Sequence, residues 1–92
     1  MTWQVELHKK VRKQIEKLPS NVRDSLIYLM HEIESKGPVR GDWPNYGKLG
    51  NKLHHCHLKK GKTTYVAVWK EENDEIKMIE MIYVGTHEKA PY

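Results

Sequence analysis

The sequence predicts an α+β fold in the order β-α-α-β-β-β, with a helical hairpin packed on a small antiparallel-meander sheet. The first observation is residues 76–84, a largely apolar run with apolar side chains on both faces of its two-residue alternation. Such a strand usually lies inside a sheet. The second observation is a pair of helix-periodic segments separated by Pro19. The third is a pair of strand-like segments, 52–60 and 63–69, that meet at a turn containing Gly61.

The N-terminal half is expected to form one strand and two helices. Residues 2–7 alternate between apolar and polar side chains, which predicts a short strand. The period then changes to that of a helix, which Pro19 ends, and Ser20 is expected to cap a second helix. Gly37 and Pro38 stop that second helix. The apolar stripes are Val11, Ile15 and Leu18 in the first helix and Val22, Leu26, Leu29, Met30 and Ile33 in the second.

Residues 37–51 contain four glycines and two prolines and are expected to form a loop. Trp43 and Tyr46 lie in this loop, and we favour packing against the core edge over stacking on nucleobases as their role. The acidic residues 71–75 are expected to turn the chain into the final strand, which Gly85 ends.

The strand predicted at residues 52–60 carries a run of histidines. Strand alternation separates one set of side chains from the other. If Cys56 faces the core, then His55, His57 and Lys59 share the open face of the sheet. The sequence therefore predicts a row of basic side chains on that face.

Composition indicates one soluble domain, residues 1–92. The 38% hydrophobic and 30% charged residues are typical of globular proteins. The longest apolar run is too short to span a bilayer, and no signal-peptide pattern follows the first residue. A single cysteine, Cys56, cannot form an internal disulfide. We therefore expect a cytoplasmic protein.

The basic residues are concentrated in one segment. The chain has a formal net charge of +4, which favours an anionic partner. Residues 48–62 contain no acid, whereas residues 63–92 carry more acids than lysines. The lysines of the basic segment are Lys48, Lys52, Lys59, Lys60 and Lys62. Because histidines lie among them, the segment predicts a phosphate-binding site.

A set of motifs, in order along the chain, resembles the RelE/ParE superfamily of toxins from type II toxin–antitoxin pairs. The resemblance covers nearly the whole chain. It depends on the element order, on Lys48-Leu49 before the meander, and on segments 61–69 and 83–88 with a terminal tyrosine. These segments read Gly-Lys-Thr-Thr-Tyr-Val-Ala-Val-Trp and Tyr-Val-Gly-Thr-His-Glu. The resemblance implies a toxin: RelE-, YoeB- and HigB-type members cleave mRNA, usually on the ribosome, and so inhibit translation.

The resemblance also implies an active site on the open face of the meander. RelE-type enzymes carry basic residues at alternate positions of the strand that opens the meander, which here are His55 and His57, with Lys59 next. A basic residue follows the glycine that ends their last strand, and His87 matches it. Tyr92 matches a tyrosine that is common near the C-terminus.

One residue of that pattern is missing. RelE-type enzymes have an arginine one position after an aromatic residue on the next strand, but here Tyr65 is followed by Val66. Charge for the transition state would then have to come from Lys59, Lys52 or Arg40.

The expected chemistry is RNA cleavage by attack of the 2′-hydroxyl, without a metal or other cofactor. This reaction needs a base for the 2′-hydroxyl, an acid for the leaving 5′-oxygen and positive charge at the phosphate. We expect His87 to be the general acid, His57 or His55 the base and Lys59 the phosphate ligand, while Tyr92 stacks on or orients a base. The expected RNA and phosphate ligands are Lys48, Lys52, Lys60, Lys62 and Arg40.

Each candidate has a simpler alternative. The histidines and lysines would also fit an ordinary solvated surface, and Tyr92 a frayed terminus. A metal site at the His-His-Cys-His run is disfavoured, because on a strand Cys56 points away from His55 and His57. For the same reason Cys56 is not expected to be a nucleophile.

Two classes of function stay open from the sequence. The first is an mRNA-cleaving toxin. The second is a non-catalytic protein, either a ParE-like gyrase inhibitor or a degenerate member that only binds its antitoxin, which Val66 favours. In both, the expected partner is an acidic antitoxin that covers the basic cleft, in a higher-order complex; the first adds mRNA, with the ribosome.

Overall fold

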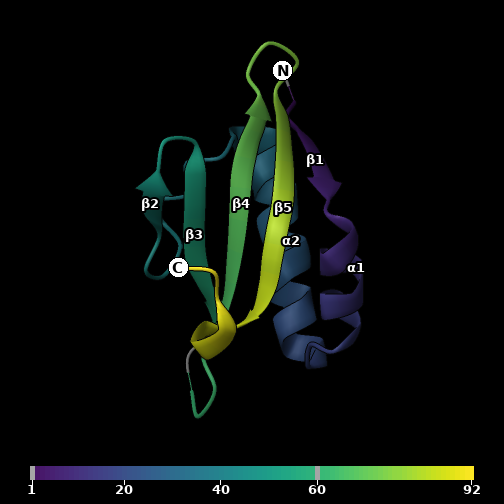
Figure 1. Ribbon diagram of the computed structural model, residues 1–92, viewed down its shortest axis with the longest axis vertical. Coiled ribbons are helices and arrows are strands. Elements are labelled where there is room, and N and C mark those ends of the chain that lie inside the picture. Colours follow the sequence, from purple (N-terminus) through teal and green to yellow (C-terminus); the bar gives the residue numbers. More distant parts are fainter. Residues whose placement is uncertain (1, 60) are drawn as a thin grey trace.

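The computed structural model describes residues 2–59 and 61–92. The chain begins with strand β1 (Gln4–Leu7), followed by helices α1 (Lys9–Glu16) and α2 (Ser20–Lys36). Four strands complete the sheet: β2 (Gly47–Gly50), β3 (Leu53–Lys59), β4 (Tyr65–Asn73) and β5 (Met78–Thr86). A short 3₁₀ helix, η1 (His87–Lys89), follows β5. The predicted α+β fold, with its helical hairpin before the meander, is confirmed (Figure 1).

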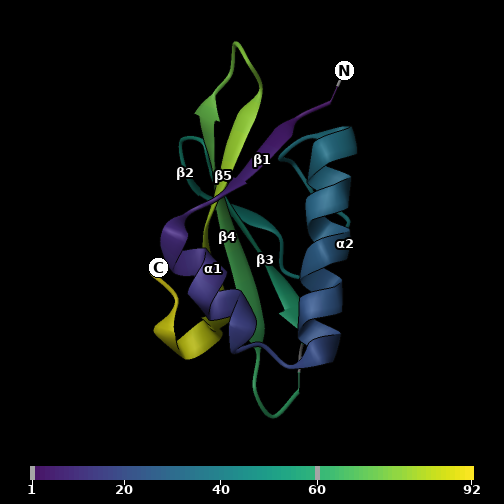
Figure 2. The ribbon, with the colours of Figure 1, turned by 90° about the vertical axis from the view of Figure 1, so that its right-hand side faces the viewer.

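The described strands form one sheet in the order β1-β5-β4-β3-β2. β1 runs parallel to β5, and the other pairs are antiparallel, so the sheet is mixed. As predicted, β5 lies inside the sheet, between β1 and β4. Helix α2 lies behind the sheet, and the C-terminal tail lies on the opposite side (Figures 1 and 2). The sheet therefore has a helix face and a tail face.

Several predicted boundaries were wrong. The segment expected to be a loop contains β2, which pairs with β3 at the edge of the sheet. Ser20 is the first residue of α2, and Pro19 occupies the cap position. The last strand starts at Met78 because Lys77 adopts a positive φ of 52° that ends the preceding turn. This strand also continues through Gly85 to Thr86.

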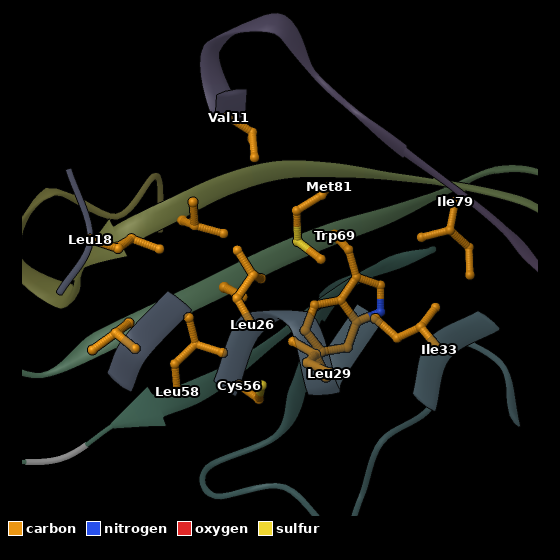
Figure 3. Close-up of a cluster of buried hydrophobic side chains, with 13 residues drawn as sticks. Val11, Leu18, Leu26, Leu29, Ile33, Cys56, Leu58, Trp69, Ile79 and Met81 are labelled. Atoms are coloured by element: carbon orange, nitrogen blue, oxygen red, sulfur yellow. The ribbon is translucent and has the colours of Figure 1, made fainter. Parts of the chain in front are cut away.

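The main core fills the space between the helices and the sheet (Figure 3). Trp69 of β4 is completely buried there, and its Nε1 donates a hydrogen bond to the carbonyl of Pro38 at 3.0 Å. This bond fixes the loop after α2 against the sheet. Cys56 and Leu58 lie in the same core, which confirms the predicted orientation of β3. Trp43 and Tyr46 pack against the core edge, as expected.

An irregularity in the β4–β5 ladder changes which side chains of β5 face the helices. Trp69 lies opposite Met81, but the preceding residue Val68 lies opposite Tyr83, so Ile82 is an extra residue. Such a bulge reverses the alternation beyond it. Val84 therefore joins Met81 in the core, and Tyr83 lies on the tail face. In a regular strand without the bulge, Tyr83 would share a face with Met81.

Candidate active site

Four side chains meet on the tail face, near the C-terminal end of β5. The rings of His55 and Tyr92 are 4.7 Å apart between centroids, and those of His57 and His87 are 5.6 Å apart. His87 and Tyr92 approach edge to face at 5.8 Å. Four of the five residues expected to carry catalysis thus form one group, which we call the histidine cluster: His55, His57, His87 and Tyr92.

The sheet register places the first two members of the histidine cluster. His55 lies opposite Val68, and His57 lies opposite Val66. Both valines are completely buried, yet neither belongs to the core between helices and sheet. They are instead covered on the tail face, where the imidazoles and the returning tail lie. Val66, in the position where an arginine was expected, therefore lies buried in the sheet next to His57.

The strand-to-tail junction places His87. The backbone N–H of His87 donates to the carbonyl of Thr64 at 2.8 Å, which ties η1 to the start of β4. One residue earlier, the carbonyl of Thr86 accepts a 2.7 Å hydrogen bond from the hydroxyl of Tyr83. To reach it, the Tyr83 ring crosses Gly85, where an added β-carbon would lie 2.7 Å from the Tyr83 oxygen. Sequence reasoning missed Tyr83, because the bulge that turns it outward leaves no periodic signal.

The environment of the histidine cluster changes two pKa values. Burial lowers the pKa of His55, and the nearby charge of His87 lowers it further. His55 is therefore neutral near pH 7, as a general base must be. Burial raises the pKa of Tyr92, so its phenol stays protonated. Among the described residues, Nδ1 of His55 has no hydrogen-bond partner.

The lysines divide into those near the histidine cluster and those away from it. Lys62 and His87 line one hollow of about 380 Å³ beside η1. Lys59 is exposed at the end of β3. However, a register shift pairs it with Tyr65, so the alternation expected to continue from His57 is broken there. Lys60 lies outside the described residues.

The other predicted phosphate ligands lie elsewhere. Lys52 pairs with Asp74 at 3.0 Å, at the opposite end of β3 from His57. Lys48 lies opposite His54 in the ladder, a residue on the helix face. The side chain of Arg40 is only 11% exposed, and its guanidinium pairs with Glu32 at 3.4 Å and with Asp42 at 3.8 Å. The structure therefore does not bring Lys48, Lys52 and Arg40 to the histidine cluster.

A fourth histidine, His54, forms hydrogen bonds in the interior. His54 is completely buried; its Nδ1 is 2.6 Å from the Tyr46 hydroxyl and its Nε2 is 2.6 Å from a carboxylate oxygen of Glu71. The ring also stacks on Trp69, with 8° between the planes. The position of His54 beside Cys56 in the alternation was its only sequence signal. This Tyr46–His54–Glu71 network links the loop after α2 to β3 and β4.

The described residues contain no group of three or more His, Cys, Asp or Glu side chains arranged to hold a metal ion. Cys56 is buried in the core, and burial raises the pKa of its thiol to about 12. A thiol that stays protonated is a poor nucleophile and a poor ligand. No helix in the described part of the chain is long and apolar enough to cross a membrane.

Comparison with solved structures identifies the fold. A mutant of the E. coli toxin RelE in the free state superimposes with a TM-score of 0.74 at 20% identity, over 98% of this chain and 88% of that one. The isolated E. coli RelE toxin gives 0.69 at 21%, over 97% and 88%. The RelE–RelB complex of Pyrococcus horikoshii gives 0.64 at 19%, over 98% and 100%. The chain has the fold of RelE toxins.

No family model matches the sequence. No curated protein matches it either. The low identity with the RelE structures shows that the similarity lies in the architecture rather than in the residues. The chemistry of this RelE-like chain therefore depends on its own side chains.

Proposed function

We propose that the chain is the toxin of a type II toxin–antitoxin pair and acts as a metal-independent endoribonuclease on mRNA, on the ribosome. The observation that carries the proposal is the histidine cluster, in which three imidazoles and a phenol from β3 and the tail meet on a RelE-like fold. Two imidazoles at such separations suit a base and an acid on either side of one phosphate.

In the proposed reaction, His55 or His57 removes the proton of a 2′-hydroxyl, and the resulting oxygen attacks the adjacent phosphorus. The lowered pKa of His55 supports it as the base, because a neutral imidazole accepts a proton. His87 donates a proton to the 5′-oxygen as its bond to phosphorus breaks. The products are a 2′,3′-cyclic phosphate and a 5′-hydroxyl, so protons and electrons balance without a metal or redox cofactor.

We assign binding and orientation of the substrate to Tyr92 and to the lysine beside His87. Tyr92 is 46% exposed, so part of its side chain is accessible to a nucleobase. Lys62 supplies positive charge to the phosphate from the hollow that it shares with His87. The basic segment 48–62 thus keeps its expected role in phosphate binding, but fewer of its lysines take part than the sequence predicted.

The proposed partner is an acidic antitoxin. The RelE of P. horikoshii was solved as a complex with RelB, and the net charge of +4 of this chain suits an acidic segment. We propose that such a segment covers the histidine cluster. Replacing Lys59 and Lys62 together should then weaken neutralisation.

One observation favours a second candidate, a protein that binds its target or antitoxin without cleaving RNA. Val66 replaces the expected arginine and is completely buried, so it supplies no charge to a transition state. Expression in bacteria with mapping of mRNA 5′ ends separates the two candidates, because only a nuclease creates new ends.

The test is inducible expression of the wild type and of His87→Ala in bacteria, followed by mapping of the 5′ ends of cellular mRNA. We expect growth arrest with new 5′-hydroxyl ends inside coding regions. The variant should lose about 10²–10⁴-fold in cleavage. New ends in phase with codons would indicate action on the ribosome. Arrest without cleavage would instead favour gyrase inhibition, and folded protein without arrest would favour the binding-only alternative.

A further inference from the structure

A second hollow lies on the other side of η1, between the end of α1 and the end of β5. Its volume is about 460 Å³. In the described chain, β1 pairs with β5 only as far as Met81, so the later part of β5 has β4 on one side and no strand on the other. The side chain of Gln14 from α1 takes that place, and its Oε1 accepts a 3.0 Å hydrogen bond from the N–H of Val84. The hollow is therefore built by the fold at a free sheet edge.

The side chains that line this hollow suit a ligand that carries both a negative charge and an aromatic ring. Lys17 and Lys89 contribute two ammonium groups, and Tyr65 and Tyr83 contribute two phenol rings. None of its described lining residues is acidic. Within residues 2–59 and 61–92, neither lysine makes an ion pair, whereas Lys52 does. Unpaired cations beside aromatic rings are the elements from which single-stranded nucleic acid sites are built.

The hollow adjoins the one that His87 lines. Thr86 and Lys89 line both this hollow and the one that contains His87 and Lys62. An RNA strand that extends from His87 in this direction would therefore pass Lys89 and then Lys17. The hollow of His87 is also lined by one acid, Glu88, beside Lys62 and Lys89.

The other direction along the sheet is unfavourable for phosphates. A third hollow, between β1, β5 and α1, is lined by three carboxylates: Glu6, Glu72 and Glu80. Arg12 in the lining, and Lys70, which pairs with Glu72 at 3.3 Å, do not fully balance these three acids at neutral pH. The charge distribution thus directs an anionic chain across η1 toward the end of α1.

We propose that the hollow between α1 and η1 is a second nucleotide subsite, which binds single-stranded RNA flanking the cleaved bond through Lys17 and Lys89. The proposal rests on the proposed nuclease function and adds that the substrate is an extended strand longer than the cleaved dinucleotide. Lys89 acts at both hollows, whereas Lys17 acts at the outer one alone.

The test compares the binding of two fluorescent oligonucleotides, a trinucleotide and a nonanucleotide, each with 2′-O-methyl groups throughout so that it cannot be cleaved. Fluorescence anisotropy is measured for the wild type, Lys17→Gln and the control Lys9→Gln. Lys9 is an exposed lysine at the start of α1, whereas Lys17 is the exposed C-cap of that helix, and Lys9 does not line the hollow. Lys17→Gln should weaken binding of the nonanucleotide about three- to tenfold. The slope of log affinity against log salt concentration should become shallower by about one, as expected for the loss of one phosphate contact. The trinucleotide should bind equally to all three proteins.

Two results would overturn the subsite. One is that Lys17→Gln affects the nonanucleotide no more than Lys9→Gln does. The other is that Lys17→Gln weakens both lengths equally, which would place Lys17 at the histidine cluster. In either case, mRNA cleavage by the wild type would leave the proposed nuclease function standing. A wild type that neither binds the oligonucleotides nor cleaves mRNA would remove both proposals.

Discussion

The imidazole of His55 lies directly against Gly47: a β-carbon at Gly47 would be 3.1 Å from Nε2 of His55. The two residues are opposite each other in the β2–β3 ladder. On its other side, the same imidazole meets the ring of Tyr92. β2 thus forms one wall of the histidine cluster, and the missing side chain of Gly47 makes room for the ring of His55.

Gly47→Ala should therefore displace His55 without unfolding the chain. Gly47 has no positive φ, so the backbone accepts alanine, and only the imidazole must move. If His55 takes part in proton transfer, cleavage should fall about 10- to 100-fold. The free energy of unfolding should change by less than about 1 kcal/mol. The measurements are cleavage of a model RNA and urea denaturation.

Gly41→Ala is the matched control. A β-carbon added to Gly41 meets no described atom within 4 Å. It should leave both cleavage and stability unchanged. Full activity in Gly47→Ala would show that the ring of His55 can shift without consequence, and would remove it from the proposed mechanism.

The hydrogen bond from Tyr83 to the carbonyl of Thr86 is expected to hold η1, and with it His87. Tyr83→Phe removes the donor but keeps the ring over Gly85. The expected cost is about 0.5–1.5 kcal/mol of stability, with faster exchange of the His87 amide hydrogen, which bonds to Thr64. Hydrogen-exchange NMR measures this directly. Unchanged exchange in the variant would mean that Thr64 alone anchors the tail.

Replacing His87 should raise the pKa of His55. The positive charge of His87 is one of the two causes that lower this pKa, after burial. His87→Gln removes the charge and leaves the burial, so the pKa should rise but stay below that of an exposed histidine. Titration of the imidazole protons by NMR measures it. A fall or no change would mean that the two rings do not sense each other.

The lowered pKa of His55 also predicts how stability depends on pH. The unfolded chain has the ordinary histidine pKa of about 6.5, so between this value and the lower folded value it binds more protons than the native state. Stability then falls as pH decreases through this window. Asn or Gln at position 55 cannot titrate, so His55→Gln should lose less free energy of unfolding on acidification than the wild type. Urea denaturation at several pH values measures this for both proteins. If the wild type and His55→Gln lost the same free energy of unfolding on acidification, the prediction would be contradicted.

Much of the fold and part of the site followed from sequence periodicity. The helices, the inner position of β5 and the inward side of Cys56 depend on local patterns that tertiary contacts did not change. His55 and His57 could be placed together because they are two residues apart on one strand. His87 and Tyr92 were chosen by resemblance, and the structure places them beside the other two.

Other features depend on contacts between distant residues. β2 lies in a segment rich in glycine and proline, and its pairing with His55 is what makes it a strand. The bulge at Ile82 moves Tyr83 to the tail face, although the residue pattern there is a regular alternation. The sequence offered Arg40 as a phosphate ligand, but Arg40 is paired with Glu32 of α2. Such pairings depend on register and loop path, which periodicity does not encode.

The Tyr46–His54–Glu71 network should stabilise the sheet behind the histidine cluster. His54 is completely buried, so both ring nitrogens need partners. Glu71→Ala would leave Nε2 without its acceptor and should cost about 1–3 kcal/mol, measured by urea denaturation. Glu72→Ala is the matched control, because Glu72 is exposed and, within the described residues, forms an ion pair with Lys70 alone, at the surface. If the two variants were equally stable, water would replace Glu71 at no cost, and the network would not be what holds β3 in place.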